Sequence, residues 1–266
     1  MRFDHRAVAL EAKRLRNKYG IDTNGISDIF SFIYQQDIEL IRYPFGKNTI
    51  LGFSTFFEGK KVIVSNSSEI LSREIYTIAH ELGHIVYDFQ DSKGEIKVDV
   101  KSDGNSSISE ERAYYFADCL LMPEEKLKLM LDEVFKKTGA ELRAINIVQM
   151  QLEFCVSYSA LLERMSSLGI ITPEKKAQLY NERDFYSSKK LFSILGADEK
   201  LLLPADKLVV PPQYIDYVMS NYENKYIPLS SLQKALKLVG IDASDLKEHP
   251  ETEKEESLDD LFAEYE

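Results

Sequence analysis

Two histidines and a glutamate within the segment 73–89 have the types and spacing that metal-dependent hydrolysis requires. His80 and His84 are four residues apart, so on a helix they lie on the same face and can direct two imidazoles at one ion. Glu81 follows His80 directly and can accept a proton from a water molecule beside that ion. H-E-x-x-H is the pattern of zinc-dependent hydrolases, in which the ion acts as a Lewis acid and lowers the pKa of a bound water to about 7.

The residues around this motif predict a helix with one buried face. Apolar side chains recur at helical spacing at Ile75, Ile78, Ala79, Leu82, Ile85 and Val86. The same pattern would fit an ordinary amphipathic helix with two core or surface histidines. The chain has only four histidines, and two of them fall in register here, which favours the metal site.

A catalytic zinc ion has three protein ligands and one open position, so a third ligand is needed. The other histidines, His5 and His249, lie in the first predicted helix and in the acidic tail, which points to a carboxylate. The candidates are Asp88, Asp91, Glu95, Asp99, Asp103, Glu110 and Glu111. Glu110 and Glu111 begin a predicted helix, 110–121, that can hold a ligand rigidly. Glu110 could instead serve only as the capping-box partner of Ser107.

The elements that must position these residues indicate an α+β fold. Helices are predicted at 4–19, 28–36 and 124–137, and short strands at 38–43, 50–57 and 61–65. The second and third strands predict a hairpin, and the three together a small antiparallel sheet just before the motif helix. An exposed edge of that sheet beside the metal could hold a substrate backbone by strand addition.

The second half of the chain predicts helices only. Segments 142–150 and 157–168 resemble a helix-turn-helix, but residues 141–168 contain two arginines and three glutamates, which gives a net negative charge. A DNA reader needs basic residues there, so we expect the module to pack on the core or on a partner and to bind no nucleic acid. Further helices are predicted from Pro173 to about Arg183 and at 212–221 and 229–239.

These patterns divide the chain into four parts: a core at 1–138, the helix-turn-helix-like module at 139–195, a small helical unit at 196–246 and an acidic tail at 247–266. The tail has nine acidic and two basic residues, and disorder is expected there. The chain contains two cysteines, which make no disulfide framework. Because the sequence also has neither a membrane-spanning apolar run nor a signal peptide, we expect a cytoplasmic protein without membrane contacts.

Several motifs together resemble the ImmA/IrrE family of metallo-endopeptidases. They are T-I-A-H-E-L-G-H at 77–84, E-x-x-A-x-x-F-A at 110–117 and L-L-M-P at 120–123. The hairpin from Gly52 to Val64 and the stretch from Ile147 to Ile171 are also similar to that family. The resemblance covers roughly residues 1–171.

The resemblance implies a zincin-like core that binds one Zn²⁺ ion through His80, His84 and Glu110, with Glu81 as general base. It also implies a zinc endopeptidase whose protein substrate is a regulator such as a DNA-binding transcriptional repressor. The sequence departs from the family at Glu110-Glu111-Arg112-Ala113-Tyr114, where the common pattern is Glu-x-Glu-Ala-Asn. That departure affects the groups that support the site more than the ligand itself.

Three alternatives stay open at the level of sequence. A peptidase-like scaffold could act without catalysis by binding a partner protein or DNA, or the site could hydrolyse a small molecule. The ligand set also accepts manganese or iron in place of zinc. A second electrophile often assists the oxyanion, and Tyr76, Tyr87, Tyr114 and Tyr115 are nearby in sequence, but none of them can be selected from the sequence.

Overall fold

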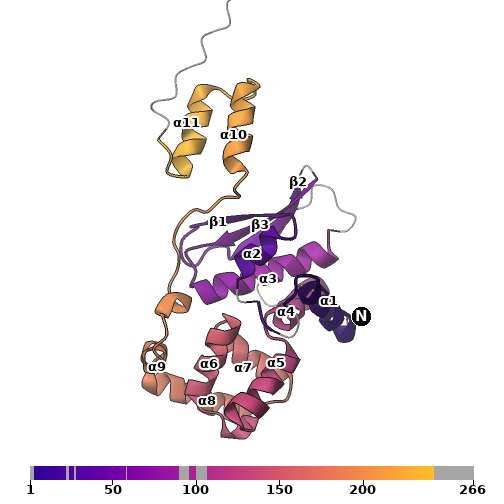
Figure 1. Ribbon diagram of the computed structural model, residues 1–266, viewed down its shortest axis with the longest axis vertical. Helices are drawn as coiled ribbons and strands as arrows, with labels where there is room; N and C mark the ends of the chain where they lie inside the picture. Colours follow the sequence, from indigo (N-terminus) through magenta and orange to yellow (C-terminus); the bar gives the residue numbers. More distant parts are fainter. Residues whose placement is uncertain are drawn as a thin grey trace, which may run out of the picture. The chain divides into compact units, whose positions relative to one another are not determined.

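The computed structural model of the chain describes residues 3–21, 24–26, 28–57, 59–89, 96–99 and 107–242. Two compact units make up the chain, Met1–Val209 and Val210–Glu266. The first unit packs helices on a small sheet (Figure 1), so the predicted α+β class is confirmed. The predicted acidic tail lies outside the described residues.

The sheet has four strands among the described residues, in the order β1-β3-β2-β4. Strands β2 (Gly52–Phe57) and β3 (Lys60–Asn66) form the predicted antiparallel hairpin, and β4 (Ile96–Asp99) pairs antiparallel with β2. Strand β1 (Ile38–Tyr43) runs parallel to β3. The expectation of a purely antiparallel sheet was therefore wrong. The connection 44–51 leads from β1 to β2 and leaves the position next to β1 open. Strand β3 then fills that position and runs parallel to β1.

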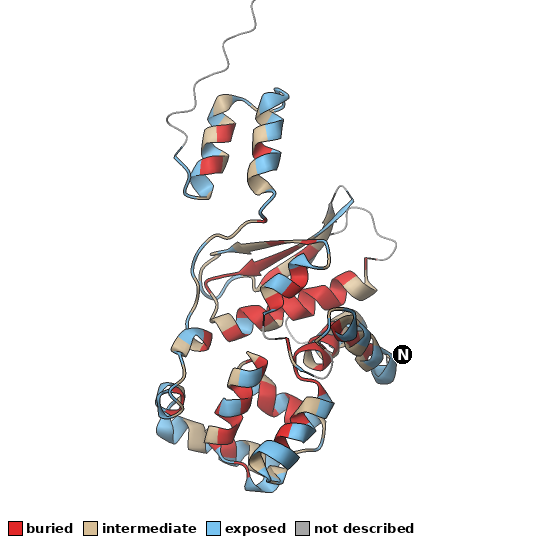
Figure 2. Ribbon diagram, viewed as in Figure 1, coloured by how far each residue is buried: buried red, intermediate tan, exposed pale blue. Residues whose placement is uncertain are grey.

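Helix α3 (Leu71–Tyr87) carries the H-E-x-x-H motif and packs beneath the sheet, buried along most of its length (Figure 2). The predicted apolar positions of its inner face lie in the main hydrophobic core. Gly52 of β2 allows the sheet to come close, because a Cβ atom there would lie 2.7 Å from Thr77 Cγ2. Helices α1 (His5–Lys18), α2 (Ile29–Tyr34) and α4 (Ile108–Leu121) complete this part of the core.

The helices that follow share the same hydrophobic core. They are α5 (Glu124–Leu129), which continues as a π-helix at Met130–Phe135, then α6 (Ala144–Phe154), α7 (Tyr158–Ser167), α8 (Pro173–Tyr186) and α9 (Ser188–Ile194). Cys155 takes a left-handed conformation, with φ of 54°, in the short connection between α6 and α7. Helix α9 was not predicted from the sequence.

Residues 203–209, which we call the strap, return from the helical part to the sheet. Leu71 N donates to Leu203 O at 2.9 Å, and Asp206 N donates to Ser67 O at 2.7 Å. Val209 and Arg42 exchange two backbone hydrogen bonds of 2.9 and 2.8 Å, which form an antiparallel bridge on the outer edge of β1. The strap therefore occupies that edge of the sheet.

The second unit contains helices α10 (Tyr214–Glu223) and α11 (Leu229–Leu238). Val218, Leu232 and Leu236 form its own small buried cluster. Throughout the described ranges, every helix is too short or too polar to cross a membrane.

A buried ion pair ties α3 to the sheet. Arg42 of β1 donates from Nε and Nη2 to the two carboxylate oxygens of Glu74 at 2.8 and 2.7 Å, and Ser65 Oγ of β3 donates to the same carboxylate at 2.9 Å. Glu74 is fully buried, and the Arg42 guanidinium stacks over the Phe30 ring. A bidentate pair of this kind is strong only while both partners are present, because either charge alone would be stranded in the core.

Replacing Arg42 by glutamine should therefore destabilise the chain by about 3 kcal/mol, since Glu74 would keep its charge without a counter-ion. The control is Arg73→Gln, which breaks an exposed pair with Glu69 and should cost less than about 1 kcal/mol. Urea unfolding followed by circular dichroism measures both. Equal, small losses in the free energy of unfolding of the two variants would show that the buried pair stabilises the chain no more than the control pair.

Candidate metal centre

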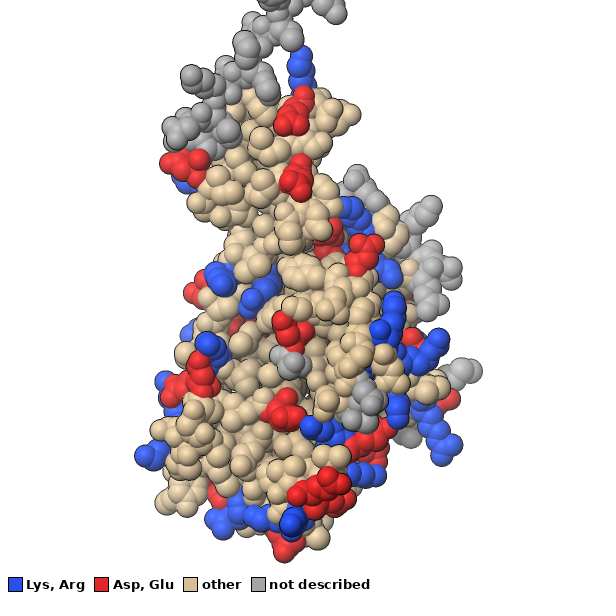
Figure 3. Space-filling view, viewed as in Figure 1, with Lys and Arg blue, Asp and Glu red and all other residues tan. Residues whose placement is uncertain are grey.

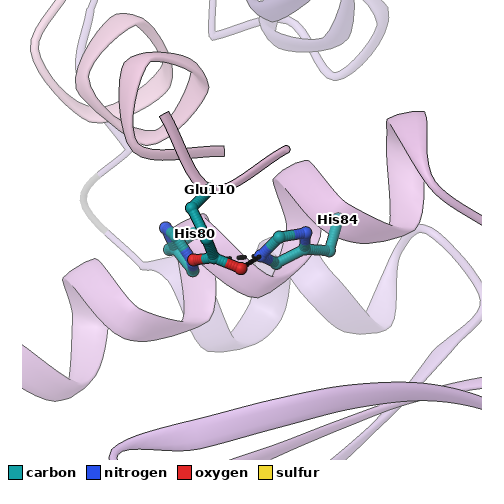
Figure 4. Close-up of side chains that lie close together, drawn as sticks. All are labelled: His80, His84 and Glu110. Carbon is teal, nitrogen blue, oxygen red and sulfur yellow. Dashed lines mark hydrogen bonds and ion pairs between the residues drawn. The ribbon is translucent and has the colours of Figure 1, made fainter. Parts of the chain in front are cut away.

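Three side chains converge between α3 and α4. His80 Nε2 lies 3.1 Å from His84 Nε2, 3.2 Å separates His80 Nε2 from Glu110 Oε2, and 3.2 Å separates His84 Nε2 from Glu110 Oε1. Figure 4 shows the three groups directed at one another, the histidines from α3 and the glutamate from α4. These are the two motif histidines and the carboxylate that the sequence proposed as third ligand.

The arrangement fits a small divalent cation. In a tetrahedral zinc site with bonds near 2.1 Å, neighbouring ligand atoms are about 3.4 Å apart, slightly more than the three distances observed, in which each histidine faces a different oxygen of Glu110. Two ring nitrogens that face one carboxylate at such short range also form a donor set that borderline metals prefer. The histidine side chains are only 1% and 2% exposed, whereas Glu110 is 28% exposed, so the site has one side open to solvent.

The close packing of α3 on α4 depends on Gly83. A Cβ atom at Gly83 would lie 3.0 Å from Ala113 Cα and 3.2 Å from Phe116 Cδ1. The two helices therefore touch almost backbone to backbone at Gly83 and Ala113, one turn beyond Glu110. Ser107 caps α4 by accepting a hydrogen bond from Glu110 N at 3.2 Å, which leaves the Glu110 carboxylate directed at the histidines.

Asp88 orients the second histidine. Its Oδ2 atom lies 2.6 Å from His84 Nδ1 and accepts a bond of 2.6 Å from Ser109 Oγ, while Arg112 pairs with its other oxygen. A carboxylate behind a metal-binding histidine places the proton on Nδ1 and leaves Nε2 free for the metal. The sequence suggested Asp88 only as a possible ligand. Its spacing of four residues from His84 was the signal for this other role.

Glu81 is fully buried beside the histidines and bonded to the sheet. Ser54 Oγ of β2 donates to Glu81 Oε2 at 2.7 Å. This bond holds the carboxylate in one orientation, as a general base requires. Sequence reasoning missed Ser54. The only signal was a polar residue at an inward position of a strand that is otherwise rich in aromatic side chains.

The charges of the site favour an ionised Glu110 next to the His84 imidazole. The hydrogen bond from His80 holds the pKa of Glu110 below its usual value, and His84 adds to that effect. Burial by itself would lower the pKa of His84, but the Asp88 hydrogen bond and the charges of Glu81 and Glu110 outweigh it and raise that pKa. A group of three carboxylates around two imidazoles attracts positive charge, which a metal ion can supply.

The other residues that the sequence analysis considered as metal ligands lie away from the site or outside the described residues. Glu111 is on the exposed side of α4, and the His5 ring packs against the Tyr115 ring with centroids 4.6 Å apart. The remaining carboxylate candidates Asp91, Glu95 and Asp103 lie outside the described residues, as does His249, and the side chain of Asp99 is not described.

Of the four tyrosines close to the motif, one flanks the site. The Tyr114 ring lies 4.2 Å from the His80 ring, centroid to centroid. Tyr76 donates to Asp118 at 2.9 Å, and burial raises its pKa well above the usual value. The Tyr87 hydroxyl is buried without a hydrogen-bond partner among the described residues, and Tyr115 packs on His5.

A family model for the IrrE N-terminal-like domain, a peptidase family designated M78, matches residues 34–166, which is half of the chain. The chain belongs to this family. The resemblance to ImmA/IrrE proteins is thereby confirmed, and membership in the M78 family supports a metallopeptidase-like function. Within this M78 domain, His80, His84 and Glu110 are a possible site for the metal. No curated protein matches the sequence.

From the close contact at Gly83, we predict that a larger residue at this position lowers the affinity for the metal. By helix propensity alone, Gly83→Ala should stabilise α3 by about 1 kcal/mol. We expect the added Cβ to push α4 away instead, so that Glu110 withdraws and zinc affinity falls about tenfold or more, the scale seen when the support of a metal ligand is disturbed. Competition with a chromogenic chelator measures this affinity.

The matched control combines Gly83→Ala with Ala113→Gly, which removes the opposing methyl group and should restore part of the affinity. Zinc affinity equal to wild type in the single variant would show that helix separation does not position Glu110.

Proposed function

We propose that the chain is a zinc-dependent endopeptidase that hydrolyses a peptide bond in a protein substrate. The observation that carries the proposal is the convergence of His80, His84 and Glu110 next to Glu81, a buried carboxylate held by Ser54. Membership in the M78 family supports the same reaction class. The expected substrate is a regulator such as a DNA-binding transcriptional repressor, and this part rests on the resemblance to ImmA/IrrE proteins.

Each residue has a definite task in this proposal. A zinc ion on His80, His84 and Glu110 would polarise the scissile carbonyl and lower the pKa of the attacking water. Glu81 accepts the proton of that water and delivers it to the departing amine nitrogen. Asp88 keeps the proton of His84 on Nδ1, and Ser54 keeps the Glu81 carboxylate in a fixed orientation.

The sheet offers one edge for an extended substrate. The strap already pairs with the outer edge of β1, whereas β4 has no second strand partner in the part of the chain that the structure describes. Strand β4 pairs with β2. Strand β2 carries Ser54, which donates the hydrogen bond to Glu81. A polypeptide added along β4 would lie two strand positions, about 10 Å, from the strand that carries Ser54, and strand addition of this kind suits a protein substrate.

We propose that the helix-turn-helix-like module packs on the core, whose hydrophobic cluster it shares, and does not bind DNA. Its second helix, α7, has one basic residue, Arg164, and that side chain is buried. On the face shown in Figure 3, basic and acidic side chains are interspersed. Phosphate recognition needs a concentrated positive surface, and the helix-turn-helix segment at 141–168 has three acidic and only two basic residues.

The first test is metal content. Elemental analysis of the wild-type chain should give about one zinc ion per chain, the stoichiometry of a single catalytic site. Glu110→Gln and His84→Ala should lose it, because each removes one of three ligands. The control is Glu111→Gln, which removes the same charge one residue away on the exposed side and should retain the metal. Manganese or iron in place of zinc would correct the metal identity, and metal retained in Glu110→Gln would refute the ligand assignment.

Proteolysis is tested separately with the chain loaded with zinc. Incubation with a lysate of the source cells, followed by mass spectrometry of new amino termini, should reveal cleavage products with wild type. Glu81→Gln should bind zinc normally and produce none of them, since it keeps the ligands and lacks the base. The same termini in both samples, or none in either, would contradict the endopeptidase reaction. Products from proteins other than repressors would correct the substrate class alone.

Tyr114 is the tyrosine we propose as hydrogen-bond donor to the oxyanion. It lies against His80 and is 42% exposed, so its hydroxyl can meet a substrate. Tyr114→Phe should lower kcat by about 100-fold with zinc content unchanged, the usual cost of losing one oxyanion donor. Tyr43→Phe, at 41% exposure on β1, is the matched control and should leave kcat unchanged. Equal rates for the two variants on a substrate found as above would exclude Tyr114 from this role.

A further inference from the structure

A cavity of about 450 Å³ lies away from the metal centre, between α1, α4, the start of α5 and α7. Helix α4 contributes Tyr115 and Cys119 to its wall. Cys119 is nine residues after Glu110, which on an α-helix corresponds to the opposite face. The cavity and the metal centre are thus separate sites on two sides of one helix.

The wall of the cavity is strongly basic. Its basic residues are Arg6, Lys13, Arg16, Lys128 and Arg164, and its acidic residues are Glu124 and Glu125. Both acids are already engaged, because Lys13 pairs with Glu125 at 2.8 Å and Lys128 with Glu124 at 2.5 Å. The lining therefore has three more basic than acidic side chains. This excess is unusual in a chain whose net charge is −11.

Among these residues, Arg164 gives the strongest indication of an anion site. It is only 3% exposed, and its Nη1 atom has no hydrogen-bond partner in the described part of the chain. Its other nitrogens have weak, neutral partners: Nε donates to Met122 O at 3.4 Å and Nη2 to Cys119 Sγ at 3.5 Å. Asp118 lies nearby and accepts the Tyr76 hydroxyl; burial raises the pKa of Asp118 to about 6, although the charge of Arg164 acts to lower it. A buried guanidinium normally has a carboxylate or phosphate across from it, because an uncompensated charge in the interior is costly.

The rest of the wall is apolar. Leu10, Ala9 and Pro123 line it, and the Tyr115 ring lies under the Arg164 guanidinium with 5.5 Å between the guanidinium carbon and the ring centroid. A volume of this size, with apolar walls and a few charged groups, is typical of sites for small molecules. Planar guanidinium groups suit the oxygens of phosphates and carboxylates, which they bind with two parallel hydrogen bonds.

We propose that this cavity binds a small organic anion, whose phosphate or carboxylate group is received by Arg164 and Arg6 and whose apolar part packs on Leu10 and Tyr115. The site is independent of the proposed peptidase reaction. It would also supply a hydrogen-bond acceptor for Arg164 Nη1.

The test is calorimetric titration of the zinc-loaded full chain at constant ionic strength. The probes are phenyl phosphate, benzoate and, as a neutral compound of similar size, benzyl alcohol. At least one of the two anions should bind saturably with one site per chain, and benzyl alcohol should not bind. Which anion binds more tightly distinguishes a phosphate site from a carboxylate site. Binding of neither anion, or equal binding of benzyl alcohol, would overturn the proposal.

Variants on exposed positions of α1 place the binding in this cavity without disturbing the core. Arg6→Gln removes a charge from the wall and should weaken binding about tenfold, the scale of one charge-assisted hydrogen bond. Its control is Arg14→Gln on the same helix, which does not line the cavity and should bind as wild type. Leu10→Glu should abolish binding by placing a carboxylate in the cavity wall, and Leu10→Gln, of the same size, should retain it. If neither Arg6→Gln nor Leu10→Glu changed the binding, the anion would bind outside this cavity, for example at the metal ion.

Discussion

The contact between the backbones of α3 and α4 at Gly83 and Ala113 determines what the site can be. A helix pair with ordinary side chains between its axes would hold Glu110 too far from His80 and His84 for one ion to bridge them. At Gly83, an added methyl group would lie only 3.0 Å from Ala113 Cα, and the carboxylate one turn earlier on α4 reaches both imidazoles. The small residue inside the H-E-x-x-H motif is thus a packing requirement as much as part of the sequence pattern.

The second constraint is the burial of charge on α3. Glu74, Glu81 and His84 are buried along this one helix, and each has a partner from a different part of the fold: Arg42 of β1, Ser54 of β2 and Asp88 at the end of α3. The sheet therefore does more than cover a helix. It provides the hydrogen bonds of the two glutamates in a dry interior, where charged groups act more strongly on a reacting group than they would in water.

Local features of the chain were predictable from the sequence, and features that depend on the pairing of distant segments were not. The histidines are in register because four residues make about one turn, and the limits of β1 and the β2–β3 hairpin follow from apolar patterns and a turn glycine. Glu110 was one of several carboxylates until the family resemblance favoured it. The parallel pairing of β1 with β3 and the bond from Ser54 to Glu81 depend on strand order in space, which no local pattern encodes.

The strap has a consequence for how this protein behaves in a crowded solution. A strand at the rim of a sheet exposes unpaired N–H and C=O groups, to which strands of other molecules can add and so begin aggregation. Val209 pairs with Arg42 at that rim, while the Arg42 side chain is held inward by Glu74. The segment that follows the M78 domain thus shields the β1 edge of the sheet from self-association and leaves strand addition to the other edge.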